Sequence, residues 1–270
     1  MLLIAERRDP DPLDGPPAAA GVDVVVPVGP NDVEVLHHCL EGIERNLRGP
    51  VGGISLVAPR DLVGSVRRVA PGDAVVVADE EVLDEATRTS LLGHLSSGAG
   101  RWRAQQLLKL SVPEVTTADA ILVVDADTIL VRPRRFRDGD RTLLLASREF
   151  NIPYYEAAAR LWRESLTLPA FSCVAHQMCF IRNEVVALRE EIEARWNMDW
   201  RSAIVQASGE RKGFAESELY GQWRLRTHPE LCVVRGFHNV SLRRSEIRSV
   251  AELERQVGRG VYSVSCHYWL

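Results

Sequence analysis

The chain has 270 residues, of which 46% are hydrophobic, and a formal net charge of −4 at pH 7. That length suffices for one large α/β domain with a buried core. The small acidic surplus argues against a nucleic-acid-binding protein, and no segment approaches the roughly 18 apolar residues of a membrane span.

Residues 1–21 are rich in Pro, Asp, Gly and Ala and predict a flexible leader, followed by a single domain over residues 22–270. The apolar run at the start of this leader is too short for a signal peptide. The five cysteines are widely spaced and form no C-x-x-C pair, which is typical of buried thiols in a reducing compartment. We therefore expect a cytoplasmic protein.

The first half of the domain, residues 22–150, alternates strand and helix patterns. Such an alternation predicts a mostly parallel central sheet of the Rossmann-like, nucleotide-binding kind. The expected strands are 22–28, 53–58, 74–78 and 142–146, and the expected helices are 33–46, 83–95 and 101–110, the last preceded by a flexible loop at 96–100.

The first three strands end in polar or turn residues, where a sheet of this kind binds its ligand. Pro27, Val28, Arg60 and Asp79 stand at these ends and are candidate contacts to a nucleotide. Turn formation explains Asp79 equally well.

A further apolar run, residues 121–124, leads directly into Asp125-Ala126-Asp127. The lack of polar alternation is typical of a strand buried on both faces. Ionised carboxylates are hard oxygen ligands suited to Mg²⁺ or Mn²⁺, ions that usually also hold substrate phosphates. The alternative is an ordinary strand end whose aspartates cap a turn or the next helix.

The helix expected at 101–110 has a polar side. Trp102, Gln105, Gln106 and Lys109 recur at spacings of three and four, so they share one side of the helix. That side, together with Arg103, is a candidate for binding phosphate oxygens and sugar hydroxyls, and a solvated helix face is the alternative.

Residues 151–270 change to aromatic-rich helices and shorter elements, an α+β pattern. This apolar second half is also a candidate homodimer surface. The expected elements are helices at 154–162, 183–196 and 216–223, a mixed segment at 171–181, short elements at 232–234 and 249–256, and a final strand at 261–266.

Three stretches resemble the glycosyltransferases of the GT-A fold, and also a group of bacterial GT-A-like proteins of unassigned function. They are residues 100–110 (GRWRAQQLLKL), 124–128 (VDADT) and 215–221 (AESELYG). The resemblance spans roughly residues 22–245. It implies a nucleotide-sugar-binding half (22–150), an acceptor-binding half (151–270), a nucleoside-diphosphate sugar as donor and a divalent cation, Mn²⁺ or Mg²⁺.

The same resemblance implies roles for individual residues near the diphosphate. Asp127 would be a direct metal ligand, while Asp125 would bind metal, ribose or both, with Ala126 between them. A histidine from near the C-terminus commonly completes such a site, and spacing favours His267 over His238. A structural histidine is the alternative for either one.

Two further pairs would line the cleft between donor and acceptor. In inverting enzymes a carboxylate at the start of the 216–223 helix deprotonates the acceptor, so Glu216 or Glu218 is the candidate base. Acidic residues also favour a helix N-terminus for its dipole, and retaining enzymes need no such base. His176 and Gln177 are candidate sugar contacts, with a hydrogen-bonded core histidine as the alternative.

The expected activity is metal-dependent transfer of a sugar, of the hexosyltransferase type, to an unknown acceptor. A nucleotidyltransferase acting on a sugar phosphate shares this chemistry but normally has a glycine-rich basic loop after the first strand, which Val28-Gly29-Pro30-Asn31 is not. A haloacid-dehalogenase-type phosphohydrolase places its D-x-D near the N-terminus. A GT-A-like protein that binds a nucleotide sugar without turnover is the non-catalytic alternative. The P-loop and G-x-G-x-x-G motifs are absent from the sequence.

Overall fold

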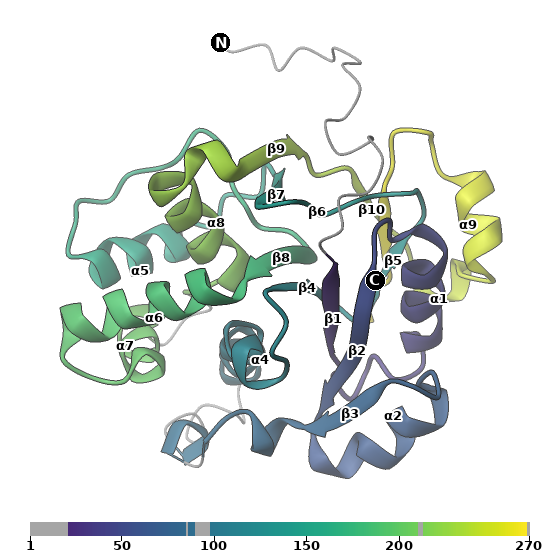
Figure 1. Ribbon diagram of the computed structural model, residues 1–270, viewed down its shortest axis with the longest axis horizontal. Helices are drawn as coiled ribbons and strands as arrows, with labels where there is room; N and C mark the ends of the chain where they lie inside the picture. The colour runs from purple at the N-terminus through teal and green to yellow at the C-terminus, as the bar shows by residue number, and fades with distance from the viewer. Residues whose placement is uncertain (1–20, 85, 90–97, 210–212, 269–270) are drawn as a thin grey trace.

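The computed structural model describes residues 21–84, 86–89, 98–209 and 213–268, so all of the expected leader except Gly21 lies outside the described residues. A five-stranded sheet stands at the centre in the order β3-β2-β1-β4-β8 (Figure 1). The first four of these strands are parallel, and β8 is antiparallel at the edge. They are β1 (Val22–Pro27), β2 (Val51–Ala58), β3 (Val75–Ala78), β4 (Ala120–Val124) and β8 (Gln177–Ile181). The predicted α/β class with a mostly parallel central sheet is confirmed.

Helices cover both faces of this sheet, because successive side chains of a strand point to opposite sides. Val24 and Leu122 pack in one buried cluster with α1, whereas Val25 and Val123 pack in another with α4. All five residues of β4 are buried, as the unbroken apolar run predicts. The helices are α1 (Leu36–Asn46), α2 (Val63–Val69), α4 (Gly98–Leu110), α5 (Ile152–Trp162), α6 (Arg182–Trp196), α7 (Trp200–Ser208), α8 (Glu216–Thr227) and α9 (Val250–Gln256).

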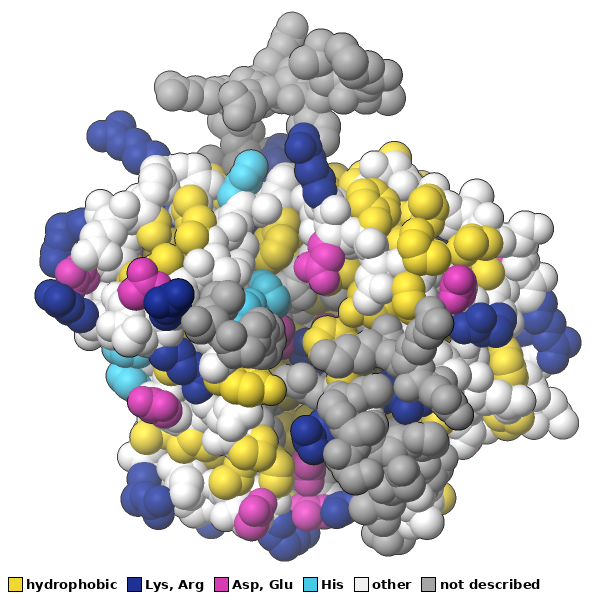
Figure 2. Space-filling model, turned by 180° about the vertical axis from the view of Figure 1, so that it is seen from behind, with side chains coloured by type: hydrophobic (Ala, Val, Ile, Leu, Met, Phe, Trp, Pro, Cys, Tyr) yellow, Lys and Arg dark blue, Asp and Glu magenta, His cyan; other side chains and the backbone are white. Residues whose placement is uncertain are grey.

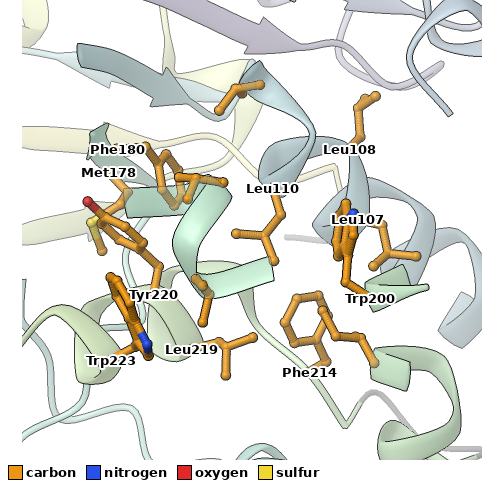
Figure 3. Close-up of a cluster of buried hydrophobic side chains, with 14 of the residues drawn as sticks. Leu107, Leu108, Leu110, Met178, Phe180, Trp200, Phe214, Leu219, Tyr220 and Trp223 are labelled. Carbon is orange, nitrogen blue, oxygen red and sulfur yellow. The ribbon is translucent and has the colours of Figure 1, made fainter. Parts of the chain in front are cut away.

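The cluster on the α4 side extends into the aromatic second half of the chain. Figure 3 shows Leu107 and Leu110 of α4 near Trp200, with Phe180 and Tyr220 packed together beyond them. The Phe180 and Tyr220 ring centroids are 4.8 Å apart, a distance typical of favourable aromatic pairs. This packing ties α4 to α6, α7 and α8.

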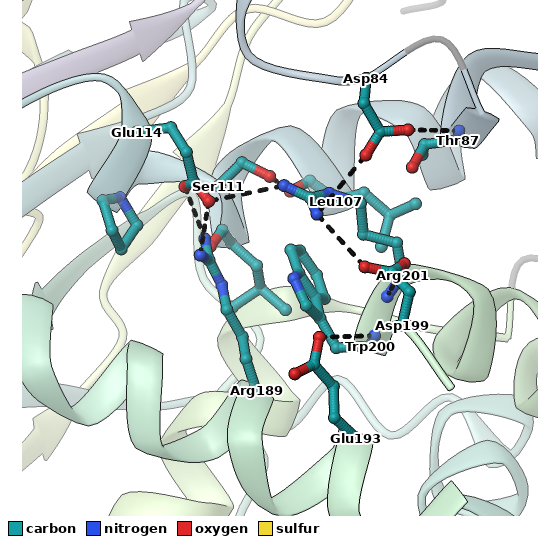
Figure 4. A network of polar contacts seen from close by, with 12 residues as sticks. Asp84, Thr87, Leu107, Ser111, Glu114, Arg189, Glu193, Asp199, Trp200 and Arg201 are labelled. Atoms are coloured by element: carbon teal, nitrogen blue, oxygen red, sulfur yellow. Dashed lines mark hydrogen bonds and ion pairs between the residues drawn. The ribbon is translucent and has the colours of Figure 1, made fainter. Parts of the chain in front are cut away.

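A polar network reinforces the same junction (Figure 4). The Trp200 ring packs against two guanidinium groups, those of Arg189 and Arg201, each 4.5 Å from the ring centroid. Arg189 also pairs with Glu114, just past the end of α4, at 2.8 Å. Helices α6 and α7 therefore hold the C-terminal end of α4 in place.

Two smaller sheets join the two halves of the sequence. In one, β7 (Arg141–Ala146) pairs in parallel with β9 (Cys232–Gly236) and antiparallel with β6 (Arg137–Asp138). In the other, β11 (Ser263–Ser265) lies between β5 (Thr128–Leu130) and β10 (Asn239–Ser241). Because β11 pairs with the strand that follows the D-x-D, the end of the chain is brought to that motif.

The element boundaries differ from expectation at several places. The prediction of a loop at 96–100 is wrong for residues 98–100, which form the first turn of α4. Glycine is destabilising mainly in the middle of a helix, so it is tolerated at this position. Residues 96–97, and 90–95 of the helix expected at 83–95, lie outside the described residues. Helix α7, which the sequence pattern did not predict, is capped by Asp199, whose carboxylate accepts from the N–H groups of Arg201 and Ser202.

The described surface carries charges of both signs. In Figure 2 basic and acidic side chains are interspersed over the face shown, with hydrophobic side chains in small groups between them. Among the described residues, no helix combines the length and the apolarity that crossing a membrane requires.

Candidate active site

Asp125 and Asp127 stand at the carboxyl end of β4, beside the point where the strand order of the central sheet reverses. The sheet continues from β1 through β2 and β3 on one side, and β4 lies on the other. Open α/β sheets bind ligands outside such a switch point. The N–H of Thr128 donates to the Asp125 carbonyl at 2.9 Å, which closes a turn before β5. The chain therefore leaves the sheet at this motif, with both aspartates at its edge.

Lys109 joins two carboxylates that come from distant parts of the chain. Its ammonium nitrogen lies 2.6 Å from Oδ1 of Asp125 and 3.2 Å from Oε1 of Glu216, the first residue of α8. All three side chains are largely withdrawn from solvent. One turn earlier on α4, the Gln106 side-chain carbonyl accepts from the backbone N–H of Glu216 at 3.3 Å. The polar side of α4 thus faces α8 and the D-x-D rather than solvent.

Each aspartate of the motif is paired with a histidine. Nδ1 of His176 lies 3.2 Å from Oδ2 of Asp125, and Nδ1 of His267 lies 2.8 Å from Oδ2 of Asp127. The two imidazole centroids are 5.2 Å apart. His176 arrives because β8 pairs antiparallel with β4, so the residue before β8 falls beside the residue after β4. His267 arrives because β11 pairs with β5.

These contacts change the ionisation of the buried groups. Burial opposes ionisation of Asp125, but the Lys109 cation and the His176 hydrogen bond hold its pKa at about 2. Burial works against the charge of Lys109, yet the two carboxylates raise its pKa above the ordinary value. For Glu216, burial prevails over Lys109 and raises the pKa. Asp125 is therefore the firmly ionised partner, and Glu216 is the carboxylate that protonates more readily.

Two residues of this site were not predicted as functional. Asp32, in the turn after β1, accepts from Arg244 at 2.8 Å, and burial together with the charge of Asp127 raises its pKa. Arg244 also donates to the carbonyls of Asn31 and Cys266. The sequence offered one signal, since Asp32 stands in the turn that follows the first strand, and that strand ends at the same edge of the sheet as β4.

Trp102 and Arg103, both candidate donor contacts, bind to the segment before α8. The indole N–H of Trp102 donates to the carbonyl of Phe214 at 2.9 Å, and the Arg103 guanidinium donates to the carbonyl of Gly209. The side chains of Trp102 and Arg103 are therefore engaged in hydrogen bonds to the backbone, whereas Gln106 and Lys109 lie on the side of α4 that faces the D-x-D.

Glu218 lies away from the aspartates, although it is only two residues from Glu216. Its carboxylate accepts from the hydroxyl of Ser172 at 2.8 Å, the backbone N–H of Cys173 at 2.5 Å and the amide of Gln222 at 3.1 Å. These contacts tie α8 to the loop before β8. By contrast, Oε2 of Glu216 is buried and has no hydrogen-bond partner.

The other candidate residues of the second half also divide into those that lie near the D-x-D and those that do not. Gln177 is buried in β8, and its amide lies 3.4 Å from the Ser263 hydroxyl of β11, so it joins two sheets next to His176. The exposed ring of His238 lies over Gly236. Of the two C-terminal histidine candidates, His267 is the one that contacts an aspartate of the motif.

The remaining donor candidates lie along the sheet edge. Val28 is buried and donates its N–H to the Val57 carbonyl at 2.8 Å, directly after Pro27 ends β1. Ala126 is buried between the two aspartates. Farther out, past the ends of β2 and β3, Arg60 pairs with Glu80 at 3.6 Å, and burial raises the pKa of Asp79. Arg60 and Asp79 are therefore closer to β3 than to the strand that leads into the D-x-D.

The side chains of this site can hold a cation only if a bound substrate supplies further ligands. Among the described residues, no group of three or more His, Cys, Asp and Glu side chains is arranged as a metal site. Asp127 and His267 do offer one carboxylate and one imidazole that face each other at 2.8 Å. Mg²⁺-type ions are commonly held by one or two carboxylates plus substrate phosphates and water. The residues present fit that kind of site.

The sequence matches the model of a family of unknown function (DUF6492) over residues 32–243, so the chain belongs to that family. No curated protein sequence matches it significantly. Among solved structures, the apo form of mouse xyloside xylosyltransferase 1 is similar to this chain, with 12% sequence identity and a TM-score of 0.46. The match covers 92% of this chain and 98% of the xylosyltransferase chain.

Proposed function

We propose that this member of the DUF6492 family is a glycosyltransferase that uses a nucleoside-diphosphate sugar and a divalent cation. The single observation that carries the proposal is the pair of carboxylates at the switch point of the sheet, one beside His267 and the other ion-paired with Lys109. A site of this kind has charged groups of both signs for a diphosphate and its cation. The resemblance of residues 100–110, 124–128 and 215–221 to GT-A enzymes points the same way.

In this proposal Asp127 and His267 hold the cation, with diphosphate oxygens and water as its other ligands. When bound, the cation offsets the negative charge that develops on the leaving diphosphate. Lys109 and His176 hold Asp125 in its ionised form, and these two partners also fix the orientation of its carboxylate. That arrangement suits an acceptor of hydrogen bonds from the ribose or the donor sugar.

Glu216 is the carboxylate that we propose as the base for the acceptor. Its Oε2 has no protein partner, and burial raises its pKa, which makes it a stronger base than an exposed glutamate. Glu218 lacks this freedom because three protein donors occupy its oxygens. Lys109, between Glu216 and Asp125, fixes the base relative to the donor side.

A screen of nucleotides by thermal shift tests the proposal. Nucleoside diphosphates and their sugar conjugates are added with Mn²⁺, with Mg²⁺, or with a chelator. We expect a rise in melting temperature that requires both the diphosphate and the cation, because a ligand that binds only the folded state stabilises it by mass action. A protein that no nucleoside diphosphate stabilises in a metal-dependent way would sink the proposal.

A further inference from the structure

An apolar cavity lies where α5, α7 and α8 meet, and its volume is about 50 Å³. One water needs roughly 10–15 Å³ of such volume, so the cavity has room for the edge of an aryl ring or the end of an alkyl chain. Its lining is mostly aromatic and aliphatic and includes Tyr154, Tyr155, Leu161, Trp162, Phe214 and Leu219.

The lining indicates an uncharged occupant. Glu218 is the charged side chain among the described lining residues, and its carboxylate already accepts from Ser172, Cys173 and Gln222. Its charge is therefore satisfied within the protein and does not call for a cation. An ionised group that entered the cavity would lose its hydration, and the carboxylate that it would meet is already hydrogen-bonded within the protein, so its entry is costly.

The cavity adjoins the candidate active site through the first turn of α8. Ala215 and Leu219 line it, and Glu216 lies between them in sequence. On the opposite wall, burial raises the pKa of Tyr154, and the charges of Glu216 and Lys109 also act on this phenol. The apolar wall and the charged site are therefore within electrostatic reach of each other.

We propose that this cavity binds an uncharged apolar portion, aryl or alkyl, of the acceptor substrate, and that it does so beside Glu216. The inference rests on the proposed function, since it names the class of molecule that would receive the sugar. Aromatic walls provide a large apolar contact area for such a group. The acceptor would thus carry its hydroxyl or amine next to an apolar segment.

Ligand-observed NMR on the full chain tests the cavity with phenol as the aryl probe and glycerol as a polar probe. We expect saturable binding of phenol and none of glycerol. Ala157→Leu fills the cavity from α5 and should weaken phenol binding about tenfold or more, an effect typical of lost apolar contacts in a pocket. Ala159→Leu is the matched control, because Ala159 is on the same helix and does not line the cavity. Phenol that fails to bind, or that binds Ala157→Leu as well as the wild type, would overturn the proposal.

Thermal shift with UDP or GDP and Mn²⁺ on the same samples separates the two proposals. If a nucleoside diphosphate stabilises the protein and phenol does not bind, the apolar acceptor is wrong and the proposed function stands. If phenol binds and no nucleoside diphosphate stabilises the protein, the glycosyltransferase and the acceptor role are both overturned. The comparison of phenol with glycerol uses the wild-type chain, so it holds even if Ala157→Leu does not fold.

Discussion

The ammonium group of Lys109 lies 2.6 Å from the carboxylate of Asp125, and both side chains are largely buried. Helix α4 and strand β4 thus meet at the D-x-D through an ion pair rather than through apolar contact alone. The same ammonium also lies 3.2 Å from Glu216. One cation therefore balances two carboxylates that would otherwise repel each other in a medium of low polarity.

Removal of this cation should destabilise the fold. Lys109→Met keeps the length of the side chain but leaves Asp125 and Glu216 without their common partner. We expect a loss of about 3–5 kcal/mol in the free energy of unfolding, which is typical when one member of a buried pair is removed. Urea denaturation followed by circular dichroism measures it. The double variant Lys109→Met/Glu216→Gln should recover part of the loss, and equal stability of the single and double variants would contradict the shared pairing.

Asp127 should be required for donor chemistry but not for folding. Asp127→Ala removes a hydrogen bond to His267 worth about 1 kcal/mol, so the melting temperature should fall by no more than about 4 °C. Metal-dependent stabilisation by nucleoside diphosphate and hydrolysis of the donor should both disappear. Asp73→Ala, at an exposed turn, is the control and should behave like the wild type. A variant that unfolds would give Asp127 a structural role instead.

The two glutamates of α8 should separate in function. Glu216→Gln removes the proposed base, so transfer to an acceptor should fall by about 10²–10⁴-fold while metal-dependent binding of the nucleotide persists. Glu218→Gln should change the rate of transfer much less. Steady-state kinetics of both variants provide the comparison. Equal rates for wild type and Glu216→Gln would remove the base assignment, and would fit an enzyme that retains stereochemistry.

Glu218 should instead affect stability in a pH-dependent manner. Burial raises its pKa in the folded state despite the hydrogen bonds it accepts, so the folded protein binds its proton more tightly than the unfolded chain does. Its contribution is therefore fully present below the unfolded pKa and is lost as the pH rises through the folded pKa.

The free energy of unfolding of the wild type, measured relative to that of Glu218→Gln, should accordingly fall as the pH rises from about 4 toward neutrality, by up to about 1.4 kcal/mol for each unit by which the folded and unfolded pKa values of Glu218 differ. Urea titrations of both proteins at a series of pH values measure this difference. A wild type that gains stability relative to Glu218→Gln as the pH rises would show that the folded state prefers the carboxylate.

Local pattern alone was sufficient to predict the four parallel strands of the central sheet and the position of the D-x-D, although the strand expected at 142–146 lies in a separate sheet as β7. The apolar run before Asp125 identifies a strand buried on both faces, and the aspartates must then fall at its carboxyl end. The spacing of Gln106 and Lys109 likewise predicted a shared helix side, and both reach the site. Periodicity is a local property, so it can be read without knowing what the segment packs against.

The tertiary structure alone decided which residues meet at that edge. Successive helical residues are about 100° apart, so Glu216 and Glu218 face nearly opposite directions, and only the packing of α8 against α4 selects Glu216. In the same way, the pairing of β11 with β5 brings His267 to Asp127, whereas spacing in the sequence only favoured His267 over His238. Contacts between residues far apart in sequence depend on strand register and helix packing, for which these residues carry no local signal.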